Sequence, residues 1–357
     1  MSKDNIYGFD LVTNDDIELT EIEKEELEHR KSPVYHFNIY ANRGCNLYTR
    51  SNRLEVLIGD IFDYRYEVCN RLGKGTFGNV YLCKDHKYNQ RGVAVKVIRH
   101  EKRFRKFAKI EIALYDFLNV CPNYSNNVIR MLKSFEFRNN VFLVFETHGK
   151  DLYYYYKNYN ITDKEFKSFA KQIASGLEFI HENDIIHADL KPENILVKNN
   201  HLKIIDLGSA LTEEQELHKD YIQSRYYRSP DVVFKLKTTR KIDIWSYGCI
   251  LYELTMKTPL VYAKSTRDLV IYFAHIMGYP PIDLDCYYDN SEFFVRHSKE
   301  LVSFRTVKGK FLYPNDFKWQ CDNIMLKQLV MGCCVKWDMN ERLTASKILE
   351  HPFFIEP

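Results

Sequence analysis

The chain has 357 residues, of which 45% are hydrophobic, enough to form two cores rather than one. Its formal net charge of +3 is too small to favour DNA or an anionic membrane surface as a partner. The nine cysteines lack the Cys-x-x-Cys spacing of metal and redox sites, and no apolar run is long enough for a membrane span or a signal peptide. Composition therefore predicts a two-domain intracellular protein that is not secreted and binds neither nucleic acid nor membrane.

Residues 1–65 form an acidic N-terminal accessory region. Residues 1–40 contain ten Asp or Glu and four Lys or Arg, a net charge of −6, so the rest of the chain carries +9. A helix is expected over residues 16–28, but its apolar positions are too sparse to order it alone. We expect this region to dock on the following domain, on the basic face of residues 99–109. A disordered tail is the alternative.

Residues 66–146 predict a small antiparallel sheet with one helix. Strand patterns begin at Tyr66 and recur at 80–83, 93–98 and 141–145. The first two strands flank the turn Gly73-Lys74-Gly75-Thr76-Phe77-Gly78. Because a strand rather than a helix follows Gly78, this turn is atypical of a dinucleotide-binding motif and favours a loop that covers phosphates. An ordinary turn is the alternative.

A charged residue interrupts the apolar face of the predicted helix. The apolar positions at helical spacing are Phe104, Phe107, Ala108, Leu114, Tyr115 and Leu118. Glu111 lies within this stripe, where an unpaired carboxylate would be unfavourable. We therefore predict an ion pair with Lys96 of the preceding strand, whose amine would contact ATP phosphates. The alternative is that Glu111 lies partly exposed at the edge of the stripe.

A polar break at residues 147–150 separates the sheet from residues 147–354, which are predicted to be mainly helical. An apolar helical face runs from Phe166 to Ile180. Further helices are expected at 242–254, 266–277, 324–335 and 344–350. The predicted fold class is α+β, with a small antiparallel sheet lobe carrying one helix and a larger, mainly helical lobe.

Two loops of the second lobe carry the residues that phosphoryl transfer requires. Residues 187–194 read His-Ala-Asp-Leu-Lys-Pro-Glu-Asn, and residues 206–208 read Asp-Leu-Gly. Asp189 can accept a hydroxyl proton, and Lys191 can neutralise a migrating phosphate. Asn194 and Asp206 offer the oxygen ligands that Mg²⁺ prefers. The pattern predicts ATP and Mg²⁺ as cofactors, and a polar surface turn is the alternative.

Taken together, these motifs resemble a eukaryotic protein kinase domain of the CMGC group over residues 66–354. Further landmarks are Asp243, in Asp-Ile-Trp-Ser-Tyr-Gly-Cys, and Arg342. The resemblance implies ATP-dependent phosphorylation of Ser and Thr in protein substrates. It also implies that Asp231 pairs with Arg342, although the family has Glu at position 231. A pseudokinase scaffold, suggested by Leu207 and Asp231, and a small-molecule kinase of the same fold are the alternatives.

The resemblance also assigns a nucleotide site. Phe145 would guard the back of the adenine pocket, and the Glu146 carbonyl and His148 amide would hydrogen-bond the base. The full set of nucleotide-binding residues it implies is Leu72, Gly73, Gly75, Gly78, Val80, Ala94, Lys96, Glu111, Phe145, Glu146 and His148.

Residues 100–104, 128–132 and 221–230 resemble the dual-specificity tyrosine-phosphorylation-regulated kinases, and residues 19–37 resemble the accessory region of the second class of that family. The resemblance implies autophosphorylation of Tyr221. Arg225 and Arg228, four and seven residues further on, could then bind the phosphate. Lys219 stands where the family has a second Tyr, so a single phosphorylation is expected. The alternative is that Tyr221 merely packs.

Ala188 stands where most kinases have Arg, which agrees with an activation segment held by phosphorylated Tyr221 instead. The resemblance further implies that protein substrates are the partners. We expect a monomeric protein in the cytoplasm, with nuclear access left open.

Overall fold

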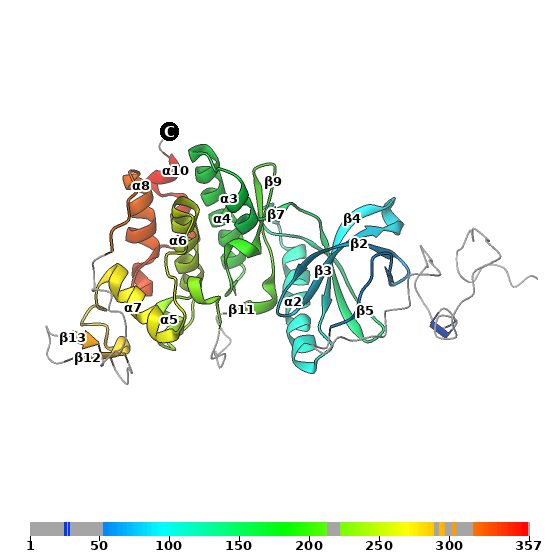
Figure 1. Cartoon of the computed structure of the whole chain (residues 1–357), viewed down its shortest axis with the longest axis horizontal. Coiled ribbons are helices and arrows are strands. Elements are labelled where there is room, and N and C mark those ends of the chain that lie inside the picture. Colours follow the sequence, from blue (N-terminus) through cyan, green and yellow to red (C-terminus); the bar gives the residue numbers. More distant parts are fainter. Residues whose placement is uncertain are drawn as a thin grey trace, which may run out of the picture. The chain divides into compact units, whose positions relative to one another are not determined.

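The computed structural model describes residues 25–26, 28, 53–212, 222–288, 293–296, 302–304 and 317–355. The chain divides into two compact units (Figure 1). The first comprises Met1–Asn119 and Arg130–Thr147, and the second comprises Val120–Ile129 and His148–Pro357. None of the described helices is long and apolar enough to cross a membrane.

The first unit is an antiparallel sheet with one long helix, as predicted, and the sheet has six strands. Its strands lie in the order β1-β2-β3-β4-β6-β5. They are β1 Ile61–Phe62, β2 Tyr66–Lys74, β3 Gly78–Asp85, β4 Arg91–Ile98, β5 Met131–Phe137 and β6 Asn140–Glu146, and the helix is α2 Lys102–Val120. The sequence pattern did not predict β1 and β5.

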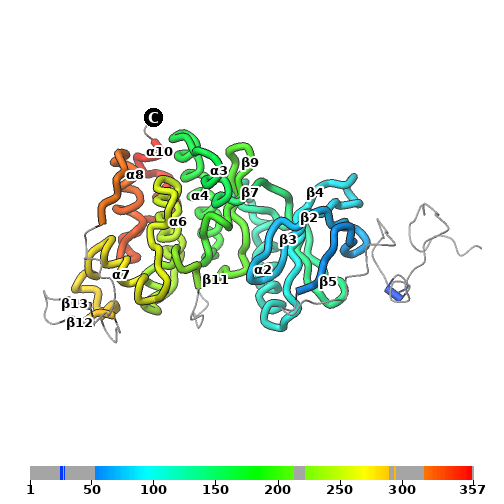
Figure 2. The backbone as a smooth tube through the Cα atoms, viewed as in Figure 1, coloured from blue at the N-terminus to red at the C-terminus, as the bar shows by residue number. Residues whose placement is uncertain are grey.

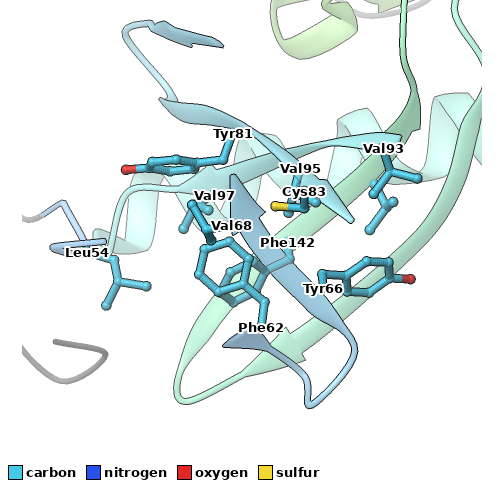
Figure 3. Close-up of a cluster of buried hydrophobic side chains, with 11 residues drawn as sticks. Leu54, Phe62, Tyr66, Val68, Tyr81, Cys83, Val93, Val95, Val97 and Phe142 are labelled. Atoms are coloured by element: carbon cyan, nitrogen blue, oxygen red, sulfur yellow. The ribbon is translucent and has the colours of Figure 1, made fainter. Parts of the chain in front are cut away.

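Alternating apolar residues of the central strands form the core of this unit (Figure 3). The Phe62 ring lies between Tyr81 and Phe142, with ring centroids 6.1 and 4.9 Å away. Leu54, which precedes the first strand, is buried in the same cluster. Leu54 and Phe62, which precede Tyr66, therefore pack into the core of the sheet unit.

The second unit is mainly helical, as predicted (Figure 2). Its helices are α3 Leu152–Asn158, α4 Asp163–Glu182, α5 Pro230–Val233, α6 Lys241–Met256, α7 Thr266–Met277, α8 Ile324–Lys327, α9 Ala345–Leu349 and α10 Pro352–Ile355. Helix α4 starts at a capping box, in which Thr162 and Glu165 each bond the backbone N–H of the other.

One predicted helix differs from the structure. The α-helical pattern over residues 324–335 continues beyond α8 as a π-helix, Gln328–Cys334. This wider helix brings Cys334 against Gly248 of α6, where an added Cβ would lie 2.7 Å from the Cys334 Cβ. Periodicity in the sequence cannot predict such a change, because it depends on how closely the two helices approach.

Short strands frame the loops of the second unit. They are β7 Lys150–Asp151, β8 Ile185–Ile186, β9 Ile195–Lys198, β10 His201–Ile204, β11 Leu211–Thr212, β12 Phe294–Arg296 and β13 Val302–Phe304. The pairs β9–β10 and β8–β11 are antiparallel. Residues 187–194 lie between β8 and β9, and residues 206–208 lie between β10 and β11. Because β8 pairs with β11 and β9 pairs with β10, the two loops are held by the same strand pairs.

The division into units differs from the predicted lobes of residues 66–146 and 147–354. Residues 120–129 belong to the second unit because their backbone pairs with β10. The Ile129 N–H donates to the Ile204 carbonyl at 2.9 Å, and the Ile204 N–H donates to the Asn127 carbonyl at 2.7 Å. These residues lie far apart in the sequence, so only the fold brings them together.

The acidic leader contacts the first unit through Glu26. Its carboxylate accepts hydrogen bonds from Nε and Nη2 of Arg138, both at 2.9 Å, and from the Tyr64 hydroxyl at 2.5 Å. This contact differs from the predicted basic face of residues 99–109, because Arg138 lies in the turn between β5 and β6. Residues 25, 26 and 28 are helical, and the remainder of the predicted helix over 16–28 lies outside the described residues.

Candidate active site

Asp243 of α6 fixes the backbone of the loop that contains Asp189. Its buried carboxylate accepts hydrogen bonds from the N–H groups of His187 at 2.8 Å and Ala188 at 2.9 Å. The His181 ring, at the end of α4, also lies 2.9 Å from this carboxylate through Nε2. The Asp243 carboxylate thus joins α6 to the end of α4 and to the backbone of this loop, and these contacts hold the loop in place.

Ala188 connects this loop to the segment that follows Tyr221. Its backbone is left-handed, with φ of +60°, which is uncommon for a residue other than glycine. Its buried methyl group packs with Leu211 and Ile222, and its carbonyl accepts the Gln223 N–H at 3.0 Å. A small residue at position 188 therefore fits against the chain from residue 222 onward.

The structure brings the predicted proton acceptor and the predicted cation together. Asp189 Oδ2 accepts a hydrogen bond from Lys191 Nζ at 2.6 Å. Asp189 Oδ1 accepts from both the N–H and the hydroxyl of Ser224, at 2.9 and 2.7 Å, and Lys191 also donates to that hydroxyl at 2.9 Å. We did not predict a role for Ser224, because it is 35 residues from Asp189 and no local pattern connects them.

Asn194 and Asp206 have the chemistry of Mg²⁺ ligands. The Asn194 Nδ2 donates to the Asp189 carbonyl at 2.9 Å, which leaves its Oδ1 as the atom suited to a cation. The Asn194 carbonyl accepts the Ile205 N–H at 2.9 Å, so the two loops are joined next to Asp206. Asp206 is left-handed, with φ of +66°, and its Oδ1 accepts the Gly208 N–H at 3.2 Å. Leu207, the next residue, is buried.

Two ligands from the protein are appropriate for this ion. Mg²⁺ in phosphoryl-transfer sites keeps several waters and binds one or two carboxylates together with phosphate oxygens. Over the described residues no group of three or more His, Cys, Asp or Glu could hold a metal ion. The donor set therefore fits Mg²⁺ bound with a nucleotide rather than a metal held by the protein alone.

In the first unit, the predicted ion pair between Lys96 and Glu111 is confirmed. Lys96 Nζ lies 2.7 and 2.9 Å from the two carboxylate oxygens of Glu111, and both residues are buried. Phe77, at the tip of the glycine-rich turn, packs edge-on against Phe104 and Phe107 of α2. The glycine-rich turn, through Phe77, and Lys96, through Glu111, therefore both contact α2.

The glycine-rich turn leaves space beside its backbone. An added Cβ would meet no atom within 4 Å at Gly73, and only the Gly78 carbonyl oxygen at 3.8 Å at Gly75. Gly78 is different, because a Cβ there would lie 2.0 Å from the Val97 carbonyl oxygen. The first two glycines thus lie beside open space, as a loop that covers phosphates would need, and Gly78 allows β3 to approach β4.

Arg53 binds this turn, a contact that we did not predict. Its Nη2 donates to the Gly75 carbonyl at 2.6 Å, and its Nη1 donates to Asn79 Oδ1 at 2.9 Å. Burial, together with the nearby charge of Arg99, lowers the pKa of Arg53. Because Arg53 precedes the first strand and has no periodic neighbours, no signal in the sequence points to it.

The remaining nucleotide-site candidates lie in both units. Leu72 is exposed on β2, Val80 is half-buried on β3, and Ala94 pairs with Phe145 across β4 and β6. The Phe145 ring packs edge-on against Tyr115 at 5.1 Å. Glu146 Oε1 accepts the Arg130 N–H at 3.0 Å. His148, in the second unit, contacts the His201 carbonyl through Nε2 at 2.9 Å.

The predicted ion pair between Asp231 and Arg342 is also confirmed, at 2.6 Å between Oδ2 and Nη1. Both side chains are fully buried. Asp231 Oδ1 has no hydrogen-bond partner among the described residues. The shorter acid therefore bonds the guanidinium through one oxygen instead of two.

Tyr221 lies outside the described residues, so its predicted phosphorylation stays a prediction. The two arginines proposed to bind its phosphate already contact backbone carbonyls. Arg228 donates to Ile222 through Nε at 2.9 Å and to Gln223 through Nη2 at 2.7 Å, and Arg225 donates to the Lys264 carbonyl. These contacts anchor the chain immediately after Tyr221.

Comparison with known proteins agrees with the resemblance seen in the sequence. A family model described as "Protein kinase domain" matches residues 66–354. The dual specificity tyrosine-phosphorylation-regulated kinase 3 of Homo sapiens is 38% identical over 322 residues, covering 82% of this chain and 54% of the relative. The dual specificity tyrosine-phosphorylation-regulated kinase 2 of Drosophila melanogaster is 32% identical over 358 residues, covering 94% and 49%. The chain thus spans about half the length of these relatives.

Proposed function

The chain belongs to the protein kinase family, and we propose that it transfers the γ-phosphoryl group of ATP to Ser and Thr hydroxyls of protein substrates. The observation that carries the proposal is the arrangement of Asp189, Lys191 and Ser224, in which a carboxylate and an ammonium group are held together by a third side chain. This geometry places a proton acceptor beside a positive charge, as phosphoryl transfer requires.

Each residue then has a defined part in the reaction. Asp189 orients the substrate hydroxyl and accepts its proton, while Ser224 fixes the carboxylate. Lys191 stabilises negative charge on the transferred group. When bound, ATP supplies the phosphoryl group and Mg²⁺ neutralises its charge; Asn194 and Asp206 would hold the ion. Lys96, oriented by Glu111, would bind the phosphates.

Asp189→Asn tests this function. The substitution keeps the size of the side chain and removes the proton acceptor, so transfer to a generic protein substrate should fall by about 10²–10⁴-fold. Binding of ATP, measured by titration with a fluorescent nucleotide, should be unchanged. Asp184→Asn is a suitable control, because the Asp184 side chain is 80% exposed in the same unit. Transfer by Asp189→Asn at the wild-type rate would contradict the proposal.

We further propose that the protein phosphorylates its own Tyr221. The relatives bear the name dual specificity tyrosine-phosphorylation-regulated kinase, and the chain after Tyr221 is anchored to the catalytic loop through Gln223 and Ala188. Mass spectrometry of the protein expressed in bacteria should find phosphate on Tyr221 in the wild type and none in Asp189→Asn. Equal phosphorylation of both would show that another enzyme modifies Tyr221.

A further inference from the structure

A cavity of about 490 Å³ in the second unit adjoins the catalytic carboxylate. Lys191 and Ser224 line this cavity, and both contact Asp189. If the proposed function is correct, a protein substrate whose hydroxyl reaches Asp189 must place a neighbouring side chain at this cavity. The groups that line it therefore select among substrates.

Two lysines converge on one side of the cavity. Lys157 of α3 and Lys257 at the end of α6 both line it, and their Nζ atoms lie 5.1 and 5.4 Å from the centre of the Tyr156 ring. Lys157 Nζ also donates to the Lys257 carbonyl at 2.8 Å. Burial and the charge of Lys157 lower the pKa of Lys257. Both lysines therefore offer positive charge to the same cavity, which favours an anion there.

The two carboxylates that line the cavity, Glu253 and Glu193, differ in their exposure to solvent. Glu253 is buried, and its two oxygens accept hydrogen bonds from the hydroxyls of Tyr156 at 2.5 Å and Tyr227 at 2.6 Å. Glu193 is exposed and offers one negative charge. Arg225 also lines the cavity. The cavity therefore has more accessible cationic side chains, Lys157, Lys257 and Arg225, than accessible carboxylates.

We propose that Lys157 and Lys257 form a specificity subsite for a phosphorylated Ser or Thr of the protein substrate. The protein would then prefer substrates that already carry a phosphate close to the acceptor hydroxyl. A phosphate bears about −1.5 to −2 charge near neutral pH, which matches two ammonium groups, whereas a carboxylate can neutralise only one. The enzyme that supplies such a substrate must itself be a protein kinase.

The backbone conformation of Lys257 allows its side chain to be removed without straining the main chain. Its φ is +58°, a left-handed conformation that glycine adopts without strain. Lys257→Gly should therefore remove the charge without destabilising the fold. Lys235→Gly is the matched control, because Lys235 has φ of +57° in the same unit and does not line the cavity.

The experiment compares peptides that share one acceptor sequence and carry phosphoserine, Glu, Ser or Arg at successive positions on both sides of the acceptor. For the wild type, kcat/KM for the best phosphoserine peptide should exceed that for its Ser counterpart by about tenfold or more. Lys257→Gly, alone or with Lys157→Gln, should lose most of this preference while its activity on the Ser peptide stays unchanged. Lys235→Gly should behave as the wild type.

Activity on the Ser peptide reports the proposed phosphoryl transfer, and the ratio between peptides reports the subsite. An active enzyme that shows no phosphoserine preference at any position would overturn the subsite and leave the function intact. So would a preference that survives the double substitution. A preference for Arg that disappears in Glu193→Gln would assign the cavity to cations and would also overturn the proposal. Inactivity on every peptide would overturn both.

Discussion

Each unit of the molecule contains a buried ion pair of similar length, 2.7 Å between Lys96 and Glu111 and 2.6 Å between Arg342 and Asp231. Their surroundings differ. The Arg342 guanidinium also donates to the backbone carbonyls of Lys336 and Lys241, and its side chain is fully buried. Lys96 presents an ammonium group to both oxygens of one carboxylate, and its side chain is 10% exposed.

The difference shows that similar ion pairs can serve separate purposes. Arg342 ties several segments of the second unit together, so its removal would leave both a buried charge and carbonyls without donors. Lys96 lies on the interior strand β4, and in the proposed function its amine contacts the phosphates of the nucleotide. We therefore expect the Arg342–Asp231 pair to determine the stability of the fold and the Lys96–Glu111 pair to determine the rate of phosphoryl transfer.

The largest effect on stability is expected for Arg342→Met. Removal of the guanidinium leaves the buried Asp231 carboxylate unpaired, and we expect the free energy of unfolding to fall by about 3–5 kcal/mol. Denaturant unfolding followed by circular dichroism would measure it. Asp231→Leu combined with Arg342→Met should not restore stability, because the carbonyls of Lys336 and Lys241 would still lack their donor. Full restoration by the double substitution would remove the distinction between the pairs.

Substitution of the Lys96–Glu111 pair should instead lower activity and leave stability nearly unchanged. Lys96→Met combined with Glu111→Leu replaces the pair with apolar side chains, which often leaves stability nearly unchanged. Phosphoryl transfer should nevertheless fall by about a hundredfold or more, because the amine that would orient the phosphates is absent. Denaturant unfolding and a transfer assay on the same preparation would test both expectations. Retained activity would show that Lys96 is structural.

A smaller effect is expected for Arg53→Ala. The substitution removes two hydrogen bonds that hold the glycine-rich turn at Gly75 and Asn79, and we expect KM for ATP to rise by about fivefold, corresponding to about 1 kcal/mol. The control is Glu55→Ala, because Glu55 is an exposed neighbour. Equal KM values for Arg53→Ala and the wild type would show that the contact does not influence nucleotide binding.

The smallest effect concerns Asp60, a buried carboxylate held by the Leu57 N–H at 2.8 Å. Burial raises its pKa, despite this hydrogen bond and the charge of Arg138. A raised pKa in the folded state means that stability is lost as pH rises from the unfolded value near 4 through the folded value. Asp60→Asn should flatten the dependence of unfolding free energy on pH in this range. Identical slopes for variant and wild type would contradict it.

Much of the fold could be predicted from local patterns. The strands over 80–83, 93–98 and 141–145 and the helices beginning near 104, 166, 242 and 266 follow apolar periodicity, which depends only on neighbouring residues. The strands β1 and β5 are too short or too polar to produce that signal. The π-helix depends on the approach of Gly248, which no local pattern contains.

The sequence by itself predicted the chemistry proposed for the site, because the residue types at Asp189, Lys191, Asn194 and Asp206 have few other uses at those spacings. It also predicted the partner of Glu111, since a carboxylate within an apolar stripe needs a cation. Only the tertiary structure decided that Ser224 holds Asp189, that Arg53 binds the glycine-rich turn, and that Glu26 pairs with Arg138. Each of these contacts joins residues far apart in the chain, and hydrogen bonds of that kind follow from three-dimensional proximity, which periodicity and spacing do not encode.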